Sequence, residues 1–147
     1  MKTKKLISFV LAALMMLSAL SISAFASNVD SPYATGVLPS VNAGIVASYN
    51  PYVREKENAT ATYIYNQNGD TMNFAVHGTL ADGSYDEWDC TRKKGQIAVG
   101  QQRFFSQWVY EYGYRYCKLV CWSIKANTAS SGVWSPDSVG SYPYCNL

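Results

Sequence analysis

The sequence predicts an all-β domain, an antiparallel β-sandwich of about six to eight short strands, with a small β-barrel as the alternative. Three observations predict this class. Runs of alternating apolar and β-favouring residues recur along the chain, and turn residues separate them. No segment after the first 26 residues shows a sustained helical period. No internal repeat recurs at a fixed spacing, so a single domain is expected.

The first 26 residues have the pattern of a secretory signal peptide. Lys2, Lys4 and Lys5 precede an uncharged, mostly apolar run of about 17 residues, and Ala24-Phe25-Ala26 gives the small-x-small pattern that signal peptidase reads. The alternative is an uncleaved membrane anchor, but a spanning helix needs roughly 20 residues. We therefore expect cleavage after Ala26 and a secreted, extracellular protein of bacterial type, with no membrane anchor left after cleavage.

Removal of the signal changes the charge of the chain. Three of the 12 Lys and Arg residues lie within it, whereas all ten Asp and Glu residues follow it. The mature part therefore has nine basic and ten acidic side chains, a net charge of about −1. This balance gives no support for a nucleic-acid partner.

The mature chain is predicted to divide into an arm and a domain. Residues 27–58 are rich in Ser, Asn, Pro and small residues, which favours a flexible N-terminal arm. Within it we expect only a short strand near residues 44–49 and a solvated charged segment at 54–57. Residues 59–147 are expected to form the β domain.

Alternating runs flank Asn68-Gly69, which is the strongest short-range signal of a β-hairpin. A two-residue loop there pairs Tyr63 with Phe74 on an apolar face. The same register leaves His77 on the opposite face, which we expect to be mainly exposed to solvent.

A second hairpin is predicted around Glu111-Tyr112-Gly113, a three-residue loop whose last position favours glycine in the left-handed conformation. It places Trp108 opposite Tyr116 and requires residues 114–125 to be extended. Further short strands are expected at 95–101 and 126–134. Because both faces of the second hairpin are apolar or aromatic, a sandwich or barrel is needed to cover them.

Four cysteines in an exported chain predict two disulfides. Within an extended strand, Cys117 and Cys121 are about 13 Å apart, and a disulfide tolerates at most about 7 Å between Cα atoms. Two schemes remain open: Cys90–Cys121 with Cys117–Cys145, or Cys90–Cys117 with Cys121–Cys145. A four-thiolate zinc site is the alternative, but zinc knuckles usually lie on turns, so strand geometry favours bridges and no metal.

Few groups suit catalysis. His77 is the only histidine, and bridged cysteines leave it no thiol to activate. The acidic segment Asp82–Asp89 is interpreted as a solvated turn, with a calcium loop as the alternative. Carboxylates such as Asp86 and Glu111 are candidates for a glycosidase pair. We expect no cofactor, and an enzyme is the less favoured interpretation.

Aromatic residues exceed the obvious needs of one core, and exposed aromatics on a rigid β face suit stacking on sugars or anchoring a protein. The leading prediction is therefore a non-catalytic binding module for an extracellular glycan or protein. The alternatives are a bacteriocin-like antagonistic protein and a small extracellular hydrolase. The candidate ligand-binding residues are Trp108, Tyr110, Tyr112, Tyr114 and Trp122.

Overall fold

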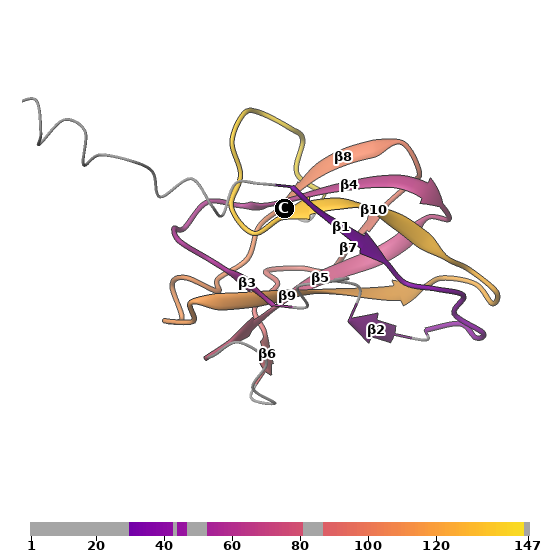
Figure 1. Cartoon of the computed structure of the whole chain (residues 1–147), viewed down its shortest axis with the longest axis horizontal. Helices are drawn as coiled ribbons and strands as arrows, with labels where there is room; N and C mark the ends of the chain where they lie inside the picture. The colour runs from indigo at the N-terminus through magenta and orange to yellow at the C-terminus, as the bar shows by residue number, and fades with distance from the viewer. Residues whose placement is uncertain (1–29, 43, 47–52, 81–86, 146–147) are drawn as a thin grey trace, which may run out of the picture.

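The computed structural model describes residues 30–42, 44–46, 53–80 and 87–145, and over these ranges the chain forms strands and turns without a helix. Ten strands make two antiparallel sheets that face each other as two layers (Figure 1). The predicted all-β class is confirmed, and the arrangement is sandwich-like. The barrel alternative is wrong because the strands divide into two separate sheets. The described strands outnumber the six to eight expected, because several contain only two or three residues.

The first sheet has four strands in the order β1-β10-β4-β8. These are β1 (Ser31–Ala34), β10 (Ser130–Ser135), β4 (Thr62–Gly69) and β8 (Gln101–Phe105). A register shift between Ser131 and Gly132 marks a bulge in β10. A bulge bends its strand and increases the local twist, so β10 can follow the curvature of the sheet.

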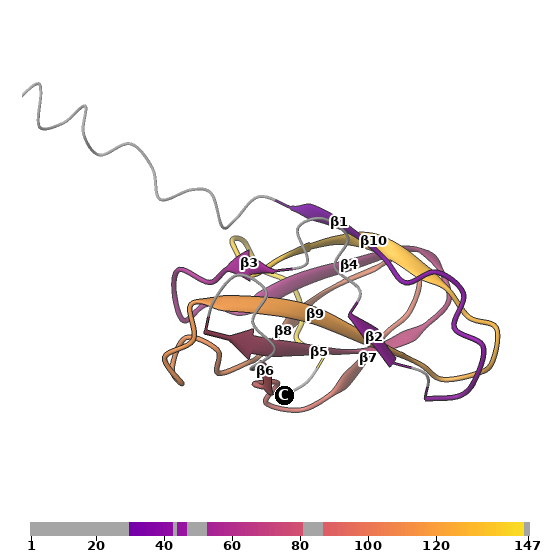
Figure 2. The same cartoon turned by 60° about the horizontal axis from the view of Figure 1, so that its bottom comes forward.

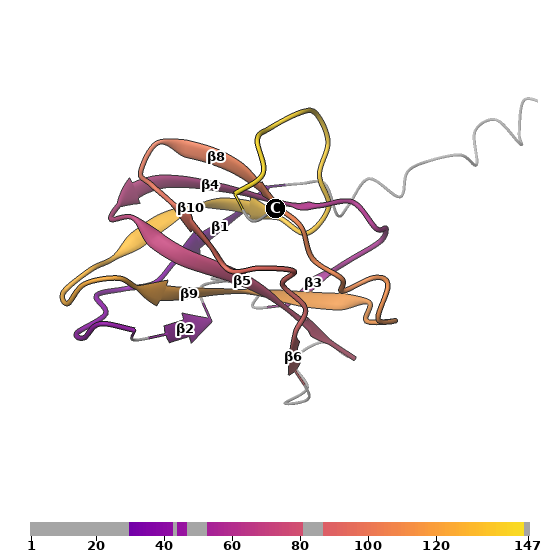
Figure 3. The same ribbon diagram turned by 180° about the vertical axis from the view of Figure 1, so that it is seen from behind.

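The second sheet is built around the long pair β5 (Met72–Thr79) and β9 (Tyr116–Ser123), which are hydrogen-bonded over their full lengths. β2 (Gly44–Val46) and β3 (Arg54–Glu55) extend it beside β9. β6 (Glu87–Asp89) and β7 (Gly95–Ile97) extend it on the other side of β5. The turned view and the view from behind show this sheet under the first one (Figures 2 and 3).

The core lies between the two layers and is closed by alternating side chains of both sheets. On β9, Cys117 and Cys121 share a face, as the extended reading of residues 114–125 predicts, and this face, with Leu119, points inward and is fully buried. Lys118 and Trp122 point outward. Large aromatic side chains fill the remaining space; they are Tyr33, Phe74, Phe105 and Trp134.

The predicted pairing around Asn68-Gly69 is wrong. Gly69 has φ of +93° and turns the chain, but β4 then pairs with β10 and β8 while β5 pairs with β9. The two strands lie in different sheets, so Tyr63 is not opposite Phe74. The face of β4 that packs against the core is also the opposite of the predicted one, because Ile64 is fully buried and Tyr63 is only partly buried. Tyr63 instead donates its hydroxyl proton to Gln102 Oε1, 2.8 Å away.

The second predicted hairpin also fails as a strand pair. Gly113 has φ of +83°, as its position in a loop requires, and its amide donates to the carbonyl of Tyr110. β8 ends at Phe105 in the first sheet and β9 begins at Tyr116 in the second. Residues 106–115 therefore connect the two layers, and Trp108 is not opposite Tyr116.

The predicted N-terminal arm contributes three short strands, β1, β2 and β3, to the two sheets. β1 pairs with β10, and β3 pairs with β9. The charged segment at 54–57 is not a solvated lead-in, because Arg54 is 9% exposed and Lys56 is 0% exposed. The alternation of a strand directs these two basic side chains inward and Glu55 outward.

Two further predictions lie partly or wholly outside the described residues. The signal peptide, residues 1–26, is one of them. Of the acidic segment, only Glu87–Asp89 is described, and it forms β6. No helix long and apolar enough to cross a membrane occurs in the described ranges.

Candidate functional site

The outer face of the second sheet carries a hollow of about 360 Å³ lined by Asn42, Asn73, Lys94 and Trp122. We call it the Trp122 hollow. Asn73 of β5 and Trp122 of β9 are directly opposed in the ladder, so their side chains lie together on one face. Lys94 precedes β7, and Asn42 lies in the turn before β2 with φ of +59°. Four separate segments thus bring an indole, two amides and an ammonium group together.

Lys94 gives the Trp122 hollow its charge. Its ammonium nitrogen lies 4.5 Å from the centre of the Trp122 ring, a cation–π contact, and 3.7 Å from Asp89 Oδ2. The Lys94 side chain is 59% exposed, so neither contact confines it. Lys94 can therefore move toward an anionic group of a ligand and uncover the indole face.

A chain of charged groups continues on the same face beyond Trp122. The His77 ring centre lies 6.3 Å from that of Trp122, and His77 Nδ1 lies 3.2 Å from Glu87 Oε1. Lys118 Nζ donates to Glu87 Oε2 over 3.0 Å. Burial opposes ionisation of Glu87, but the hydrogen bonds from Lys118 and His77 outweigh it and hold the pKa of this carboxyl below its ordinary value. The side chain of His77 is only 16% exposed, so the prediction of a mainly solvent-exposed histidine is wrong.

The connection between the layers carries a second aromatic surface, which we call the Trp108 patch and define as Arg92, Trp108 and Tyr112. Trp108 is 40% exposed and Tyr112 is 52% exposed, and their ring centres are 5.6 Å apart in an edge-to-face arrangement. The Arg92 guanidinium lies 5.8 Å from the Trp108 ring centre. The amide of Tyr112 donates to the Trp108 carbonyl, which fixes the spacing of the two rings.

The other predicted aromatics are placed differently. The guanidinium carbon of Arg115 lies over the Tyr110 ring, 4.4 Å from the ring centre. Tyr114 is partly buried and packs against the core. The five predicted ligand-binding residues are therefore not brought together: Trp108 and Tyr112 lie in the Trp108 patch, Trp122 lines the Trp122 hollow, Tyr114 packs against the core, and Tyr110 pairs with Arg115. Sequence reasoning selected Trp122 but missed Asn42, Asn73 and Lys94, since each lies in a different segment.

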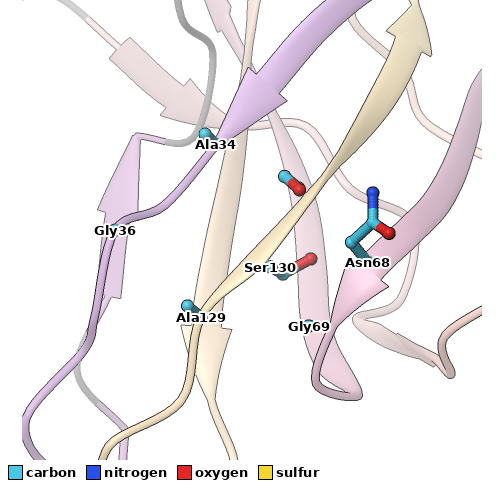
Figure 4. Close-up of a pocket in the computed structure, with 7 residues that line it drawn as sticks. Ala34, Gly36, Asn68, Gly69, Ala129 and Ser130 are labelled. Carbon is cyan, nitrogen blue, oxygen red and sulfur yellow. The ribbon is translucent and has the colours of Figure 1, made fainter.

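A second hollow, of about 280 Å³, lies where β1, β10 and the end of β4 meet (Figure 4). Small residues line most of it, among them Ala34, Gly36, Gly69 and Ala129. Among the described residues that line it, Asn68 contributes the only amide side chain and none is charged or aromatic. This hollow offers a ligand fewer directed contacts than the Trp122 hollow does.

The cysteines do not supply a nucleophile. Cys90, Cys117, Cys121 and Cys145 are thiols in the structure, so neither predicted pair of disulfides is present in it. Burial raises the pKa of Cys117 and of Cys145 to about 12, which keeps these thiols protonated at neutral pH. Among the described residues, no three His, Cys, Asp or Glu side chains converge as metal ligands do.

The fold and these surfaces define an all-β protein of two antiparallel sheets with aromatic contact surfaces and, in its described part, no assembled catalytic group. Residues 21–138 match the model of a family described as protein of unknown function (DUF2712), and the chain belongs to this family. Comparisons with curated proteins and with solved structures found no match.

Proposed function

We propose that the protein is an exported, non-catalytic module that binds an extracellular glycan at the Trp122 hollow. The observation that supports this proposal is the meeting of an indole, two amide side chains and an exposed ammonium group in one open hollow. The apolar face of a sugar ring stacks on an indole, while its hydroxyl groups exchange hydrogen bonds with amides. The hollow lies within the usual size range of small-ligand sites, roughly 300–1,000 Å³.

Export is part of the proposal and is supported by the N-terminal sequence pattern. We propose that the signal is removed after Ala26 and that the mature protein works outside the cell. There it meets glycans of a wall or a host, and an oxidising environment in which cysteines pair. N-terminal sequencing of protein recovered from the culture medium should begin at Ser27. Retention of residues 1–26 in the released protein contradicts this part.

The binding proposal is tested with a glycan array followed by titration calorimetry on the mature protein. Wild type should bind at least one glycan, and Trp122→Ala should weaken that binding by about fivefold or more, if a sugar ring gains from stacking about the 1–3 kcal/mol that a nucleic-acid base gains on an aromatic side chain. Trp108→Ala is the matched control, since it removes an exposed indole from the other surface. Equal binding by wild type and Trp122→Ala overturns the proposal, and so does the absence of any bound glycan.

A further inference from the structure

The Trp108 patch lies on the connection between β8 and β9, at the end of the sandwich where β9 begins (Figures 1 and 3). The fully buried side chain of Val109 anchors this connection in the core. The amide of Trp108 donates to the Cys90 carbonyl over 2.9 Å, which ties the connection to the segment after β6. The amide of Tyr114 donates to the Val109 carbonyl over 3.0 Å and closes a turn. The connection therefore holds its exposed side chains in a fixed arrangement.

Two large aromatic side chains stay exposed on this anchored connection. Trp108 and Tyr112 are 40% and 52% exposed, and their rings contact each other edge to face. An indole and a phenol each join an apolar ring to one polar N–H or O–H group. This combination favours the boundary between the headgroups and the hydrocarbon of a bilayer, where Trp and Tyr are enriched. The pair of rings is thus suited to enter a lipid headgroup layer.

Positive charge is concentrated beside these rings. Residues 92–94 lie next to the connection, because the amide of Arg92 donates to the Ser106 carbonyl over 3.2 Å. The charged residues of 92–94 and 106–115 are all exposed, and they are Arg92, Lys93, Lys94, Glu111 and Arg115. Four of these five are basic, whereas the chain after residue 26 has nine basic and ten acidic side chains. Lys94 belongs to the Trp122 hollow, so three basic residues and one acidic residue remain beside the Trp108 patch.

Two of these basic groups are placed against aromatic rings. The guanidinium carbon of Arg92 lies 5.8 Å from the Trp108 ring centre, and that of Arg115 lies 4.4 Å from the Tyr110 ring centre. A guanidinium can stack on an aromatic face and still offer two parallel hydrogen bonds to a phosphate. A lipid phosphate can therefore be bound directly beside a ring that enters the headgroup layer.

We propose that the Trp108 patch, together with Lys93 and Arg115, docks on the surface of a bilayer that contains anionic phospholipid. The rings of Trp108 and Tyr112 enter the headgroup layer, and the basic side chains bind lipid phosphates. A deformable lipid surface requires no shaped pocket, which agrees with the position of these side chains outside the linings of both hollows. This contact is separate from the glycan site proposed at the Trp122 hollow.

The test is co-sedimentation of the mature chain with vesicles of phosphatidylcholine alone and with vesicles of phosphatidylcholine mixed with phosphatidylglycerol. We expect binding to the mixed vesicles that is at least about fivefold tighter than binding to the neutral ones, and that weakens as salt is added. Equal binding to both kinds of vesicle, or no binding to the mixed vesicles, overturns the proposal. Capture of the chain by immobilised polyglutamate without vesicle binding also overturns it, because the patch then recognises an acidic polypeptide.

Matched variants test whether the Trp108 patch makes the contact. Trp108→Ala should weaken binding to the mixed vesicles by about fivefold or more, because it removes a buried ring, and Arg92→Gln should weaken it by about fivefold. Trp122→Ala and Lys125→Gln are the controls, since they remove an indole and a 68%-exposed ammonium group from outside the patch. Circular dichroism reports whether each variant forms the sheets. Equal losses in folded patch variants and folded controls contradict the assignment.

A second variant keeps a ring at position 108 and so decides the assignment even if Trp108→Ala does not fold. Bromine on the lipid acyl chains quenches the fluorescence of an indole that lies at the edge of the hydrocarbon. Trp108→Phe should therefore show less quenching by brominated mixed vesicles than wild type does. Unchanged quenching in Trp108→Phe overturns the assignment of Trp108 to the contact.

Discussion

Lys56 Nζ and Asp137 Oδ1 lie 2.5 Å apart, and neither side chain has any exposed surface. Lys56 Nζ also donates to the carbonyl oxygens of Thr60 and Pro136, at 2.6 and 2.8 Å. All three ammonium protons therefore have acceptors. The pair joins the segment after β3 to the turn after β10, 81 residues away along the chain.

The carboxylate of this pair is equally well satisfied. Asp137 Oδ2 accepts the backbone amide of Glu57 at 2.9 Å, and Oδ1 accepts that of Asn58 at 3.3 Å. A buried charge is tolerated when it is both paired and hydrogen-bonded. Removal of one partner leaves the other charge buried without compensation, which is the costly case.

We expect Lys56→Met to lower the free energy of unfolding by about 3–5 kcal/mol, because it leaves the Asp137 carboxylate unpaired in the interior. Urea unfolding followed by tryptophan fluorescence measures this change. Lys125→Met is the control: Lys125 also forms an ion pair, with Asp70 at 3.0 Å, but its side chain is 68% exposed. The control should leave the midpoint unchanged within error, and an equal loss in both variants contradicts the assigned role of burial.

Gly78→Ala should destabilise the protein by about 1–3 kcal/mol, the usual cost of forcing an extra methyl group into a packed core. The new Cβ atom would meet Cys90 Sγ and the Tyr114 ring at less than 3.0 Å. Chemical denaturation of the reduced protein measures the effect without a disulfide. Tyr114→Leu in the same chain should recover part of the loss through coupling between the two sites. If the changes in unfolding free energy of the two substitutions simply add in the double variant, the steric explanation is contradicted.

The class of fold could be predicted because it depends on local pattern. The run Tyr116–Ser123 alternates and favours strands, so its extended form and the shared face of Cys117 and Cys121 followed from sequence alone. Strand partners could not be predicted in the same way. The Asn68-Gly69 turn occurs, but the first sheet offers β4 two better partners in β10 and β8. Alternation identifies two faces of a strand and does not say which sheet a strand joins.

The candidate site shows the same limit. Trp122 could be selected from its residue type, but its neighbours Asn73 and Lys94 are adjacent to it only through the pairing of β5, β7 and β9. Lys56 and Asp137 are typical surface residues in isolation. Nothing local in their sequence indicates that the fold buries both.

The interaction of Glu87 with Lys118 and His77 should appear as a pH dependence of stability. The pKa of Glu87 is lowered in the folded state from its ordinary value of 4.5, so its contribution to stability is fully present above about pH 4.5. That contribution is lost as the pH falls through the folded-state pKa. The difference in unfolding free energy between wild type and Glu87→Gln should therefore shrink as the pH falls below about 4.5. A difference that is independent of pH contradicts the ionic role of Glu87.

The charge of Lys94 should decide which glycans the Trp122 hollow prefers. Lys94→Glu places a carboxylate beside Trp122 and Asp89, at a position where the lysine side chain is 59% exposed. This carboxylate repels an anionic sugar residue. The substitution should reduce the affinity for a uronic-acid oligosaccharide about ten times as much as it reduces the affinity for the neutral counterpart. This ratio corresponds to a change of about 1–2 kcal/mol in a partly solvated charge interaction. Lys93→Glu makes the same charge change at an exposed neighbour outside the lining of the hollow. Calorimetry at two salt concentrations should show the discrimination weakening at the higher one, because salt screens exposed charges. Equal effects of the two substitutions would mean that net charge, and not the position of Lys94 over the indole, governs binding.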